Sequence, residues 1–427
     1  MRIIFPVLLC SFFLFLHAGP AGRNTGSTQT IENPYEINIP LLQQKLKPGQ
    51  IIIKYTLLKN TVYIFFYEKN TMGYRKLNIT TSELVNWVNR LTEPLDDFTR
   101  GNVDYLHLYY DLPLARQLYV VLLKDILEIR QNGQAIRELF IIPDRELFKL
   151  PFEALVTGFK RQDPDPTTIF SEYASANYVI RDYTVSYFLS LFDIQKRAPL
   201  PAKDKKKYII TAFGSPGTHG FFREIPAAQK EILGISSIFG KVESRIFLAD
   251  LFNKKNFEIF APRSRIIHLA THFVNNLDNP EYSALVFSAL KGNTPLDYSD
   301  YYDYYDFYYA QDIFKLKLDA DLVVLSACES AEKHLEGLQG LKGMTAAFRK
   351  AGTRAMIVSM WPVDEYNSQL IPFFYRQYQR GISNAAALRT AKLQFMKETT
   401  IIVNGLKISF AHPFLWANYI LYNFSLL

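Results

Sequence analysis

Residues 321–330 read DLVVLSACES, and this stretch sets the expectation for the whole fold. Its apolar residues are rich in branched side chains, run into Ser326 and Ala327, and stop at a single cysteine, Cys328. A continuous apolar run of this kind is typical of a strand buried on both faces of a parallel sheet. Open α/β folds keep their chemistry at the carboxyl ends of such strands, so we expect a thiol at a functional edge.

A second strand of the same design lies about fifty residues upstream. Residues 265–273 read RIIHLATHF, an apolar run that ends at His272. If the two strands are parallel neighbours, their tips lie roughly 5 Å apart, and the imidazole can then activate the thiol as a thiolate. His268 lies inside the apolar run, where we expect a satisfied core residue. The pattern predicts a cysteine hydrolase with a His272/Cys328 dyad.

The chain around this pair alternates between strands and helices. We expect strands at residues 207–213, 244–248, 265–270, 284–287, 321–327 and 354–360, and helices at residues 227–239, 251–260, 338–351, 369–379 and 384–397. Alternating units with apolar strands predict an α/β fold, in which helices cover both faces of a parallel sheet.

A linker divides the chain into two predicted halves. Residues 197–207 read RAPLPAKDKKK, and prolines followed by a run of lysines are typical of a linker. We place the linker at 196–207, an N-terminal half at 41–195 and a catalytic half at 208–427. The N-terminal half also mixes element types, with expected strands at 51–57, 62–67 and 138–142 and expected helices at 81–91 and 104–128.

The first residues, 1–22, have the layout of a secretory signal peptide: Arg2, an apolar run, then small residues. The alternative is a buried N-terminal helix, against which Pro6 counts. We expect export to the periplasm or the medium, and a mature chain without an integral membrane segment. Removal of the peptide would take Cys10 with it and leave Cys328 as the lone thiol, either reactive or, as the alternative, buried and inert.

The composition and motifs of the chain argue against several classes of ligand. The formal net charge is +7, and no basic stripe interleaved with aromatic residues is visible, so nucleic acid is not expected. Two glycine sets, Gly214, Gly217 and Gly220, and Gly337, Gly340 and Gly343, lack the Lys-Ser/Thr pair of a phosphate loop. We expect these glycines to let backbone pass close to the site. No cluster of ligand residues indicates a metal site, and no cofactor is expected.

An unusual segment separates the histidine strand from the cysteine strand. Residues 297–309 read DYSDYYDYYDFYY, with an aspartate at every third position. We expect a surface insertion. It is either a lid or recognition element beside the site or, as the slightly favoured alternative, a solvated loop of low complexity.

Several motifs, in this order, resemble the CHAT family of caspase-like peptidases, which are relatives of separase. The matching segments are HLATH (268–272), LVVLSACES (322–330), GLQGLKGMTAAFRKAGTRAMIVSMWPVDE (337–365), HPFLWANYIL (412–421), KLKPGQIIIKY (45–55) and LFIIPDRELFKLPFEAL (139–155). The resemblance implies a caspase-like three-layer α/β/α sandwich and a cysteine endopeptidase that carries its dyad at His272 and Cys328 without a metal. It also implies that the N-terminal half is a degenerate caspase-like unit that supports the second.

The chain departs from the family pattern in two respects. Caspase-like enzymes usually carry glycine after the histidine, and its N–H helps to form the oxyanion hole, whereas Phe273 stands here. We assign the oxyanion contacts to the backbone N–H groups of Phe273 and Cys328. Relatives also commonly carry helical repeats before this domain, which this sequence lacks, so a regulator would be a separate chain. The rival hypothesis is a catalytically inactive scaffold that binds partners.

The strand at 354–360 predicts where a substrate pocket would lie. As the next parallel strand after Cys328, it should open at the same edge of the sheet, and its tip carries Trp361 as an apolar wall and the carboxylates of Asp364 and Glu365. The corresponding segment in separase-like relatives is associated with a basic specificity residue. We therefore expect cleavage of a protein or peptide after Arg or Lys, with Asp364 as the main contact. The alternative is that Asp364 caps the following helix.

Overall fold

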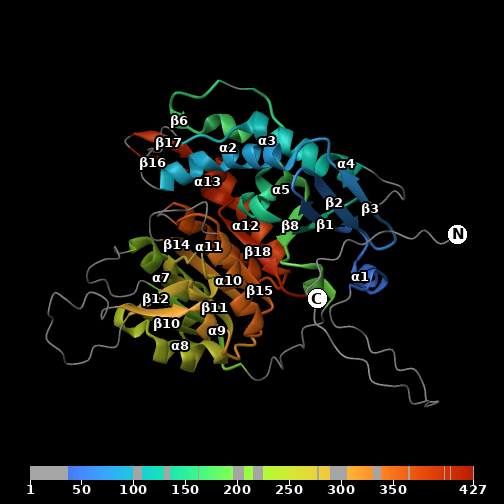
Figure 1. Cartoon of the computed structure of the whole chain (residues 1–427). Helices are drawn as coiled ribbons and strands as arrows, with labels where there is room; N and C mark the ends of the chain where they lie inside the picture. The colour runs from blue at the N-terminus through green and yellow to red at the C-terminus, as the bar shows by residue number, and fades with distance from the viewer. Residues whose placement is uncertain are drawn as a thin grey trace, which may run out of the picture. The chain divides into compact units, whose positions relative to one another are not determined.

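One large sheet runs through the molecule, with helices on both of its faces (Figure 1). The protein is seen here in a computed structural model that describes residues 37–99, 108–128, 135–161, 163–195, 206–214, 225–276, 278–288, 305–329, 338–363, 366–398, 400–403 and 405–426. Ile37–Leu427 forms one compact unit. The predicted signal peptide, residues 1–22, lies outside the described residues.

The strands of the sheet follow an order that interleaves the two ends of the sequence. From one edge to the other they are β10 (Ser244–Leu248), β9 (Tyr208–Gly214), β11 (Ser264–Val274), β14 (Leu322–Glu329), β15 (Ala355–Ser359), β18 (Tyr419–Asn423), β8 (Thr184–Tyr187), β4 (Glu138–Ile142), β1 (Gln50–Leu57), β2 (Val62–Tyr67) and β3 (Met72–Lys76). A side branch adds β12 (Ala284–Ser288), which pairs with β11, and β13 (Tyr305–Tyr309), which pairs with β12.

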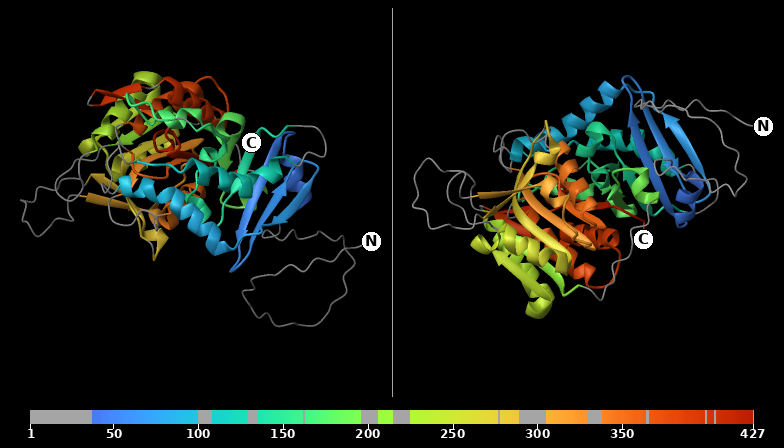
Figure 2. Two further views of the ribbon diagram at one scale, coloured as in Figure 1. Left: turned by 90° about the horizontal axis from the view of Figure 1, so that it is seen from above. Right: turned by 60° about the horizontal axis from the view of Figure 1, so that its bottom comes forward.

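The sheet consists of two parallel blocks that run in opposite directions. Strands β10, β9, β11, β14 and β15 are mutually parallel, and so are β18, β8, β4 and β1. The blocks meet where β15 pairs antiparallel with β18, in a register from Ala355 with Asn423 to Ser359 with Tyr419. In Figure 2 the blue strands of the first half lie at one end of the described unit and the yellow elements of the second half lie toward the other.

Helices cover both faces of the sheet, which confirms the predicted α/β sandwich with a mostly parallel sheet. On the second block, α7 (Pro226–Glu243) and α11 (Leu370–Tyr378) lie on one face, and α8 (Lys254–Phe260), α9 (Ala310–Ile313) and α10 (Leu338–Lys350) lie on the other. On the first block, α1 (Ile39–Lys45) and α6 (Leu191–Gln195) pack on one face, and α2 (Thr81–Thr99) and α3 (Leu112–Tyr119) on the other.

The remaining elements connect or extend these layers. Helix α12 (Asn384–Glu398) packs against α11 and reaches β8 and β18 of the sheet. Shorter elements are the π-helical turn Val120–Lys124, α4 (Asp125–Glu128), α5 (Val179–Asp182), α13 (Pro413–Trp416), a small sheet of β16 (Thr400–Val403), β17 (Leu406–Ser409) and β6 (Thr168–Ile169), and a pair of β5 (Val156–Gly158) and β7 (Asn177–Tyr178).

One sheet extends across the predicted boundary between the two halves. Of the predicted linker 196–207, only residues 206 and 207 are among the described residues. Strand β18 belongs to the second half in sequence, yet its other neighbour is β8 of the first half, through Tyr422 and Tyr187. The two halves therefore share one hydrogen-bonded sheet. The interpretation of the first half as a degenerate caspase-like unit stays a prediction.

The tyrosine-rich segment is in part a strand, so the expectation of a solvated loop is wrong for its last residues. Residues 297–304 lie outside the described part, but β13 pairs along its length with β12. Tyr308 is buried, stacks on Phe287 with ring centroids 5.2 Å apart, and donates a hydrogen bond to Oε1 of Glu258 at 3.1 Å. Burial of the aromatic ring against α8 is the reason that this end of the segment is ordered into the sheet.

Two glycines of the predicted sets do sit at close approaches. A Cβ at Gly343, in α10, would lie 2.8 Å from the carbonyl oxygen and the Cβ of Pro280. A Cβ at Gly214, at the end of β9, would lie 2.7 Å from Ile232 and 3.1 Å from the carbonyl oxygen of Ala270. Glycine therefore permits a close approach at these two positions, and the expectation that the glycines let backbone pass close to the site stays a prediction. Gly217, Gly220 and Gly337 lie outside the described residues.

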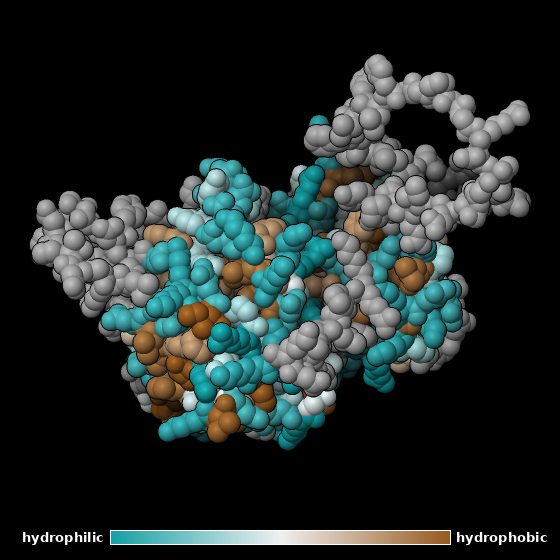
Figure 3. Space-filling model, turned by 90° about the horizontal axis from the view of Figure 1, so that it is seen from below, coloured by the Kyte–Doolittle hydropathy of each residue, from teal (hydrophilic) through white to brown (hydrophobic). Residues whose placement is uncertain are grey.

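The surface mixes hydrophobic and hydrophilic residues. On the face in Figure 3, hydrophobic residues form separate groups between hydrophilic ones. Within the described part of the chain, none of the helices combines the length and the apolar character that a membrane crossing requires.

Candidate active site

The ladder between β11 and β14 brings the two predicted dyad residues to the same level of the sheet. The strands are parallel neighbours, and their register pairs Ile266 with Leu322 and, six residues further on, His272 with Cys328. Register partners of parallel strands lie on the same face. The expectation that the two strands are adjacent and parallel is therefore confirmed. His272 is 8% exposed, so position 272 is nearly closed to solvent.

Both residues lie inside their strands, which corrects the expectation that the strands end before them. Strand β11 continues to Val274 and β14 continues to Glu329. The extension follows from β12, which pairs with Phe273 and Val274 beyond the point where the ladder between β9 and β11 ends at Ala270. The threonine between the histidines supports this pairing, because Thr271 donates its hydroxyl proton to the carbonyl oxygen of Val286.

Phe273, predicted to offer its N–H to an oxyanion, has sheet neighbours on both sides. Its register partners are Glu329 on β14 and Leu285 on β12, and its side chain is buried. Phe273 therefore sits in an extended ladder, at the position where glycine is expected in caspase-like enzymes. The assignment of oxyanion contacts to Phe273 and Cys328 stays a prediction.

His268 belongs to a buried polar network beneath the pair, as expected for a core residue. Its Nδ1 lies 3.0 Å from the hydroxyl of Tyr375, and its Nε2 lies 3.2 Å from Oε1 of Glu231. The other carboxylate oxygen of Glu231 accepts the hydroxyl proton of Ser326 at 2.8 Å, and Ser326 in turn lies 2.9 Å from the hydroxyl of Tyr419. These contacts join α7 and α11 to strands β11, β14 and β18.

Through this network, Glu231 contacts both β11 and β14, the strands that carry the predicted dyad. Its carboxylate touches β11 four residues before His272 and β14 two residues before Cys328. The carboxylate thus links the two strands through α7. Sequence reasoning missed Glu231, because a single glutamate on an amphipathic helix carries no signal that it turns toward the sheet.

The backbone just before Cys328 is held from the neighbouring strand. The hydroxyl of Ser359 donates to the carbonyl oxygen of Ala327 at 2.8 Å, and the N–H of Ala327 lies 3.2 Å from the same hydroxyl. The ladder between β14 and β15 ends at Leu325 and Val358. The side chain of Ser359 therefore continues the connection where backbone pairing stops.

The tip of β15, predicted to line a substrate pocket, is anchored into the core. Trp361 is buried, stacks on Phe414 and donates its Nε1–H to the carbonyl oxygen of Phe414 at 3.1 Å. The Oδ1 of Asn418 accepts the N–H groups of Met360 and Trp361, each at 3.0 Å. Trp361 is thus held against α13. Asp364 and Glu365 lie outside the described residues, so their predicted role is untested.

The remaining histidine of the closing motif has a structural position. His412 is buried, and its Nδ1 accepts the N–H of Phe414 at 3.1 Å, which caps α13. Its ring centroid lies 4.4 Å from that of Tyr173. Burial lowers the pKa of His412 to about 3, so it is neutral at physiological pH. His107, His219 and His334 lie outside the described residues.

Comparisons with known proteins identify a family and relatives that match part of the chain. The family model of the CHAT domain matches residues 112–423. Tetratricopeptide repeat protein 28 of Mus musculus is 34% identical over 113 residues, which cover 26% of this chain and 4% of that protein, and the Homo sapiens protein of the same name gives the same values. The match thus spans only a small part of these curated relatives.

Among solved structures, similarity extends to the separase–securin complex of Saccharomyces cerevisiae. The match has a TM-score of 0.47 and 10% sequence identity, and it covers 90% of this chain and 30% of that chain.

Proposed function

The chain belongs to the CHAT domain family, and from that premise we propose that it is a caspase-like cysteine endopeptidase. The observation that supports this best is the register of β11 and β14, which pairs His272 with Cys328 at the carboxyl ends of neighbouring parallel strands. That arrangement offers a base beside a thiol, the requirement for a nucleophilic cysteine. The described network around Glu231 holds both strands in place.

The proposed reaction is acyl transfer to Cys328. His272 takes the thiol proton, the thiolate sulfur attacks the scissile carbonyl carbon, and the C–N bond breaks as His272 returns the proton to the leaving amine. Water, deprotonated by His272, then hydrolyses the thioester and releases the acid and the free thiol. Backbone N–H groups at positions 273 and 328 stabilise the oxyanion. Neither step needs a metal or a cofactor.

A second candidate function is an inactive scaffold that binds partner proteins. The observation that favours it is the position of Phe273 between β12 and β14, in an extended ladder where an oxyanion donor has to face the substrate. The burial of His272 also favours an inactive scaffold. Export of the chain and control by a separate regulatory chain are further proposals that follow from the sequence.

Labelling with an electrophilic probe tests the proposed activity. We expect a peptidyl acyloxymethyl ketone to modify the full chain once, at Cys328, as located by mass spectrometry of the digested protein. Cys328→Ala should remove the adduct. Cys10→Ser, which changes the other cysteine of the sequence, is the matched control and should leave it in place.

The outcome of this labelling separates the two candidates. Equal labelling of wild type and Cys328→Ala, or labelling confined to Cys10, would contradict the peptidase. If wild type stays unlabelled by a panel of probes with basic, acidic and apolar residues before the electrophile, the scaffold becomes the better account.

We also expect the residue before the cut bond to be Arg or Lys, with Asp364 as its contact. A carboxylate in a partly dry pocket binds a guanidinium through charge-assisted hydrogen bonds, each stabilising by about 1.5–3 kcal/mol. Asp364→Asn should therefore lower kcat/KM for substrates with Arg by about 10- to 100-fold. Glu365→Gln is the control. A peptide library that shows acidic or apolar preference, or the same preference in Asp364→Asn, would refute this assignment.

A further inference from the structure

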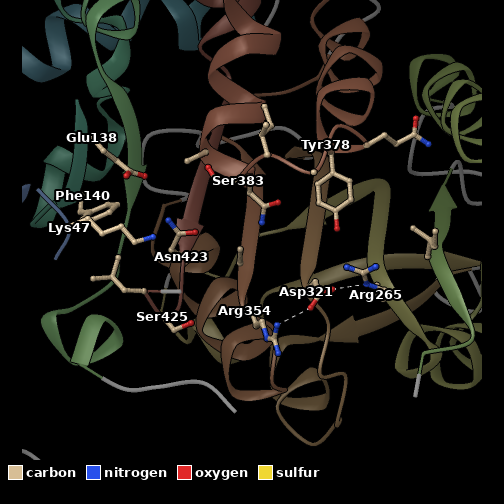
Figure 4. Close-up of a pocket in the computed structure, with 18 of the residues that line it drawn as sticks. Lys47, Glu138, Phe140, Arg265, Asp321, Arg354, Tyr378, Ser383, Asn423 and Ser425 are labelled. Carbon is tan, nitrogen blue, oxygen red and sulfur yellow. Dashed lines mark hydrogen bonds and ion pairs between the residues drawn. The ribbon is translucent and has the colours of Figure 1, made fainter. Parts of the chain in front are cut away.

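A large pocket lies at the edge of the sheet opposite to the His272/Cys328 pair. Its volume is about 1030 Å³, and its floor is formed where β11, β14 and β15 begin (Figure 4). Arg265, on this floor, precedes His272 by seven positions on the same strand. At the rise of a strand that separation is about 23 Å. The pocket is thus separate from the candidate active site, and large enough for a ligand of nucleotide size.

Both halves of the chain contribute to the walls. Lys47, after α1, and Glu138 and Phe140, on β4, lie on one side, and Tyr378, at the end of α11, lies on the other (Figure 4). The loop from α11 to α12 closes the pocket above, with Ser383 at its end. A ligand held here would contact elements that are far apart in the sequence.

The floor carries two cations around one anion. Arg265 donates from Nε to Oδ2 of Asp321 at 2.8 Å, and Arg354 donates from Nη1 to Oδ1 of Asp321 at 3.1 Å. Both guanidinium groups thus converge on the same carboxylate. Within the described part of the chain, neither terminal nitrogen of Arg265 has a hydrogen-bond partner, so a planar donor pair remains for a ligand.

Further donors without a partner in the described residues surround this floor. Ser425 is only 6% exposed, lines the pocket, and its hydroxyl has no hydrogen-bond partner there. Because a buried polar group without a partner is costly, this hydroxyl points to a missing one. The Tyr378 hydroxyl and the Lys47 ammonium group also line the pocket without a hydrogen-bond partner among the described residues.

The start of α12 adds backbone donors to the same space. The Ser383 hydroxyl accepts the N–H of Ala386 at 3.2 Å, and its carbonyl oxygen accepts the N–H of Ala387 at 2.8 Å. The N–H groups of Asn384 and Ala385, the first two residues of the helix, have no such cap, and both residues line the pocket. The positive end of the helix dipole lies here as well.

Two carboxylates of the pocket already accept hydrogen bonds. Asp321 is shared by the two arginines, and Glu138 accepts a hydrogen bond from Nε2 of Gln50 at 2.6 Å. Glu243 is exposed. The donors that face this space from Arg265, Ser425 and the start of α12 are complementary to an acceptor-rich ligand. We propose that this pocket binds a small anionic metabolite that carries phosphate or carboxylate groups.

Isothermal titration calorimetry of the full chain with three probes tests the proposal. The probes are inorganic pyrophosphate, citrate and ATP. Pyrophosphate and citrate distinguish a phosphate ligand from a carboxylate ligand, and ATP shows whether an aromatic base adds affinity. We expect saturable binding of at least one probe at one site per chain. The same probe should raise the melting temperature, because a ligand that binds only the folded state stabilises it.

Two variants and a matched control locate the binding site. Lys47→Glu reverses the charge of an exposed side chain and should weaken binding by at least tenfold without a change in melting temperature of the unliganded protein. Arg265→Gln, which changes the floor of the pocket, should also weaken binding by at least tenfold. Arg376→Glu, an exposed arginine of α11 outside the pocket, should bind as wild type does. The proposal is overturned if none of the probes saturates, or if all three variants lose affinity equally, since the binding would then reflect net charge alone.

Discussion

Replacing His272 by alanine should lower the rate at which Cys328 reacts with an electrophilic substrate by about 10²- to 10⁴-fold, the usual contribution of a positioned acid or base. The pairing of position 272 with position 328 in the ladder between β11 and β14 is the reason that we expect this histidine, and not another, to act on the thiol. The fold should survive, because the alanine removes a side chain near the carboxyl edge. Second-order labelling rates and melting curves measure the two effects.

His268→Ala is the contrasting variant on the same strand. The change removes the contact with Tyr375 and leaves the carboxylate of Glu231 buried beside Ser326 without the imidazole. We expect the melting temperature to fall, because an uncompensated buried carboxylate is strongly destabilising. A His268→Ala protein that is fully folded but unreactive, together with a reactive His272→Ala protein, would show that the base has been assigned to the wrong histidine.

Glu153→Ala should be among the most destabilising single changes away from the dyad. Glu153 is 3% exposed, and its Oε1 lies 2.8 Å from Nζ of Lys392, which is 1% exposed. Tyr187 also donates its hydroxyl proton to this carboxylate. Burial lowers the pKa of Lys392, and Glu153 counteracts that effect. Removal of the carboxylate leaves a buried ammonium group unpaired, which costs about 3–5 kcal/mol of unfolding free energy.

Urea-induced unfolding at neutral pH measures this loss, and the chain offers two controls. Glu153→Leu combined with Lys392→Met removes both charges and should recover most of the stability, since apolar replacements of a buried pair are often neutral. Glu128→Ala breaks the exposed pair of Lys124 and Glu128, whose atoms are 3.9 Å apart, and should change the free energy by less than about 1 kcal/mol. An unfolding midpoint of Glu153→Ala equal to that of Glu128→Ala would refute the argument.

The parts of the fold that the sequence predicts are those that local apolar runs encode. The strands around His272 and Cys328 are continuous branched runs, and their expected parallel pairing is the one that the register shows. Strand β13 escaped prediction, because an aspartate at every third position interrupts any apolar run and the packing of Tyr308 on Phe287 is a contact between distant segments.

The parts of the site that could not be predicted depend on contacts between distant elements. The turn of Glu231 toward Ser326, 95 positions away, is invisible in either segment alone. The sheet pairing of Phe273 was missed for a related reason. The sequence marks Phe273 as a departure from glycine, but only the arrival of β12 beside it places the backbone in a ladder on both sides.

The position of β18 in the sequence limits the order in which the strands of the sheet can pair. This strand is the bridge between β15 and β8, and about 230 residues separate it from β8 in the sequence. At a synthesis rate of about 5–20 residues per second, the strands of the first half wait roughly 10–50 s for that neighbour. Until then β8 presents an open edge in the nascent chain, a surface prone to pairing with other strands. Since β18 is the last strand of this sheet in the sequence, the join between the halves cannot form before it is synthesised.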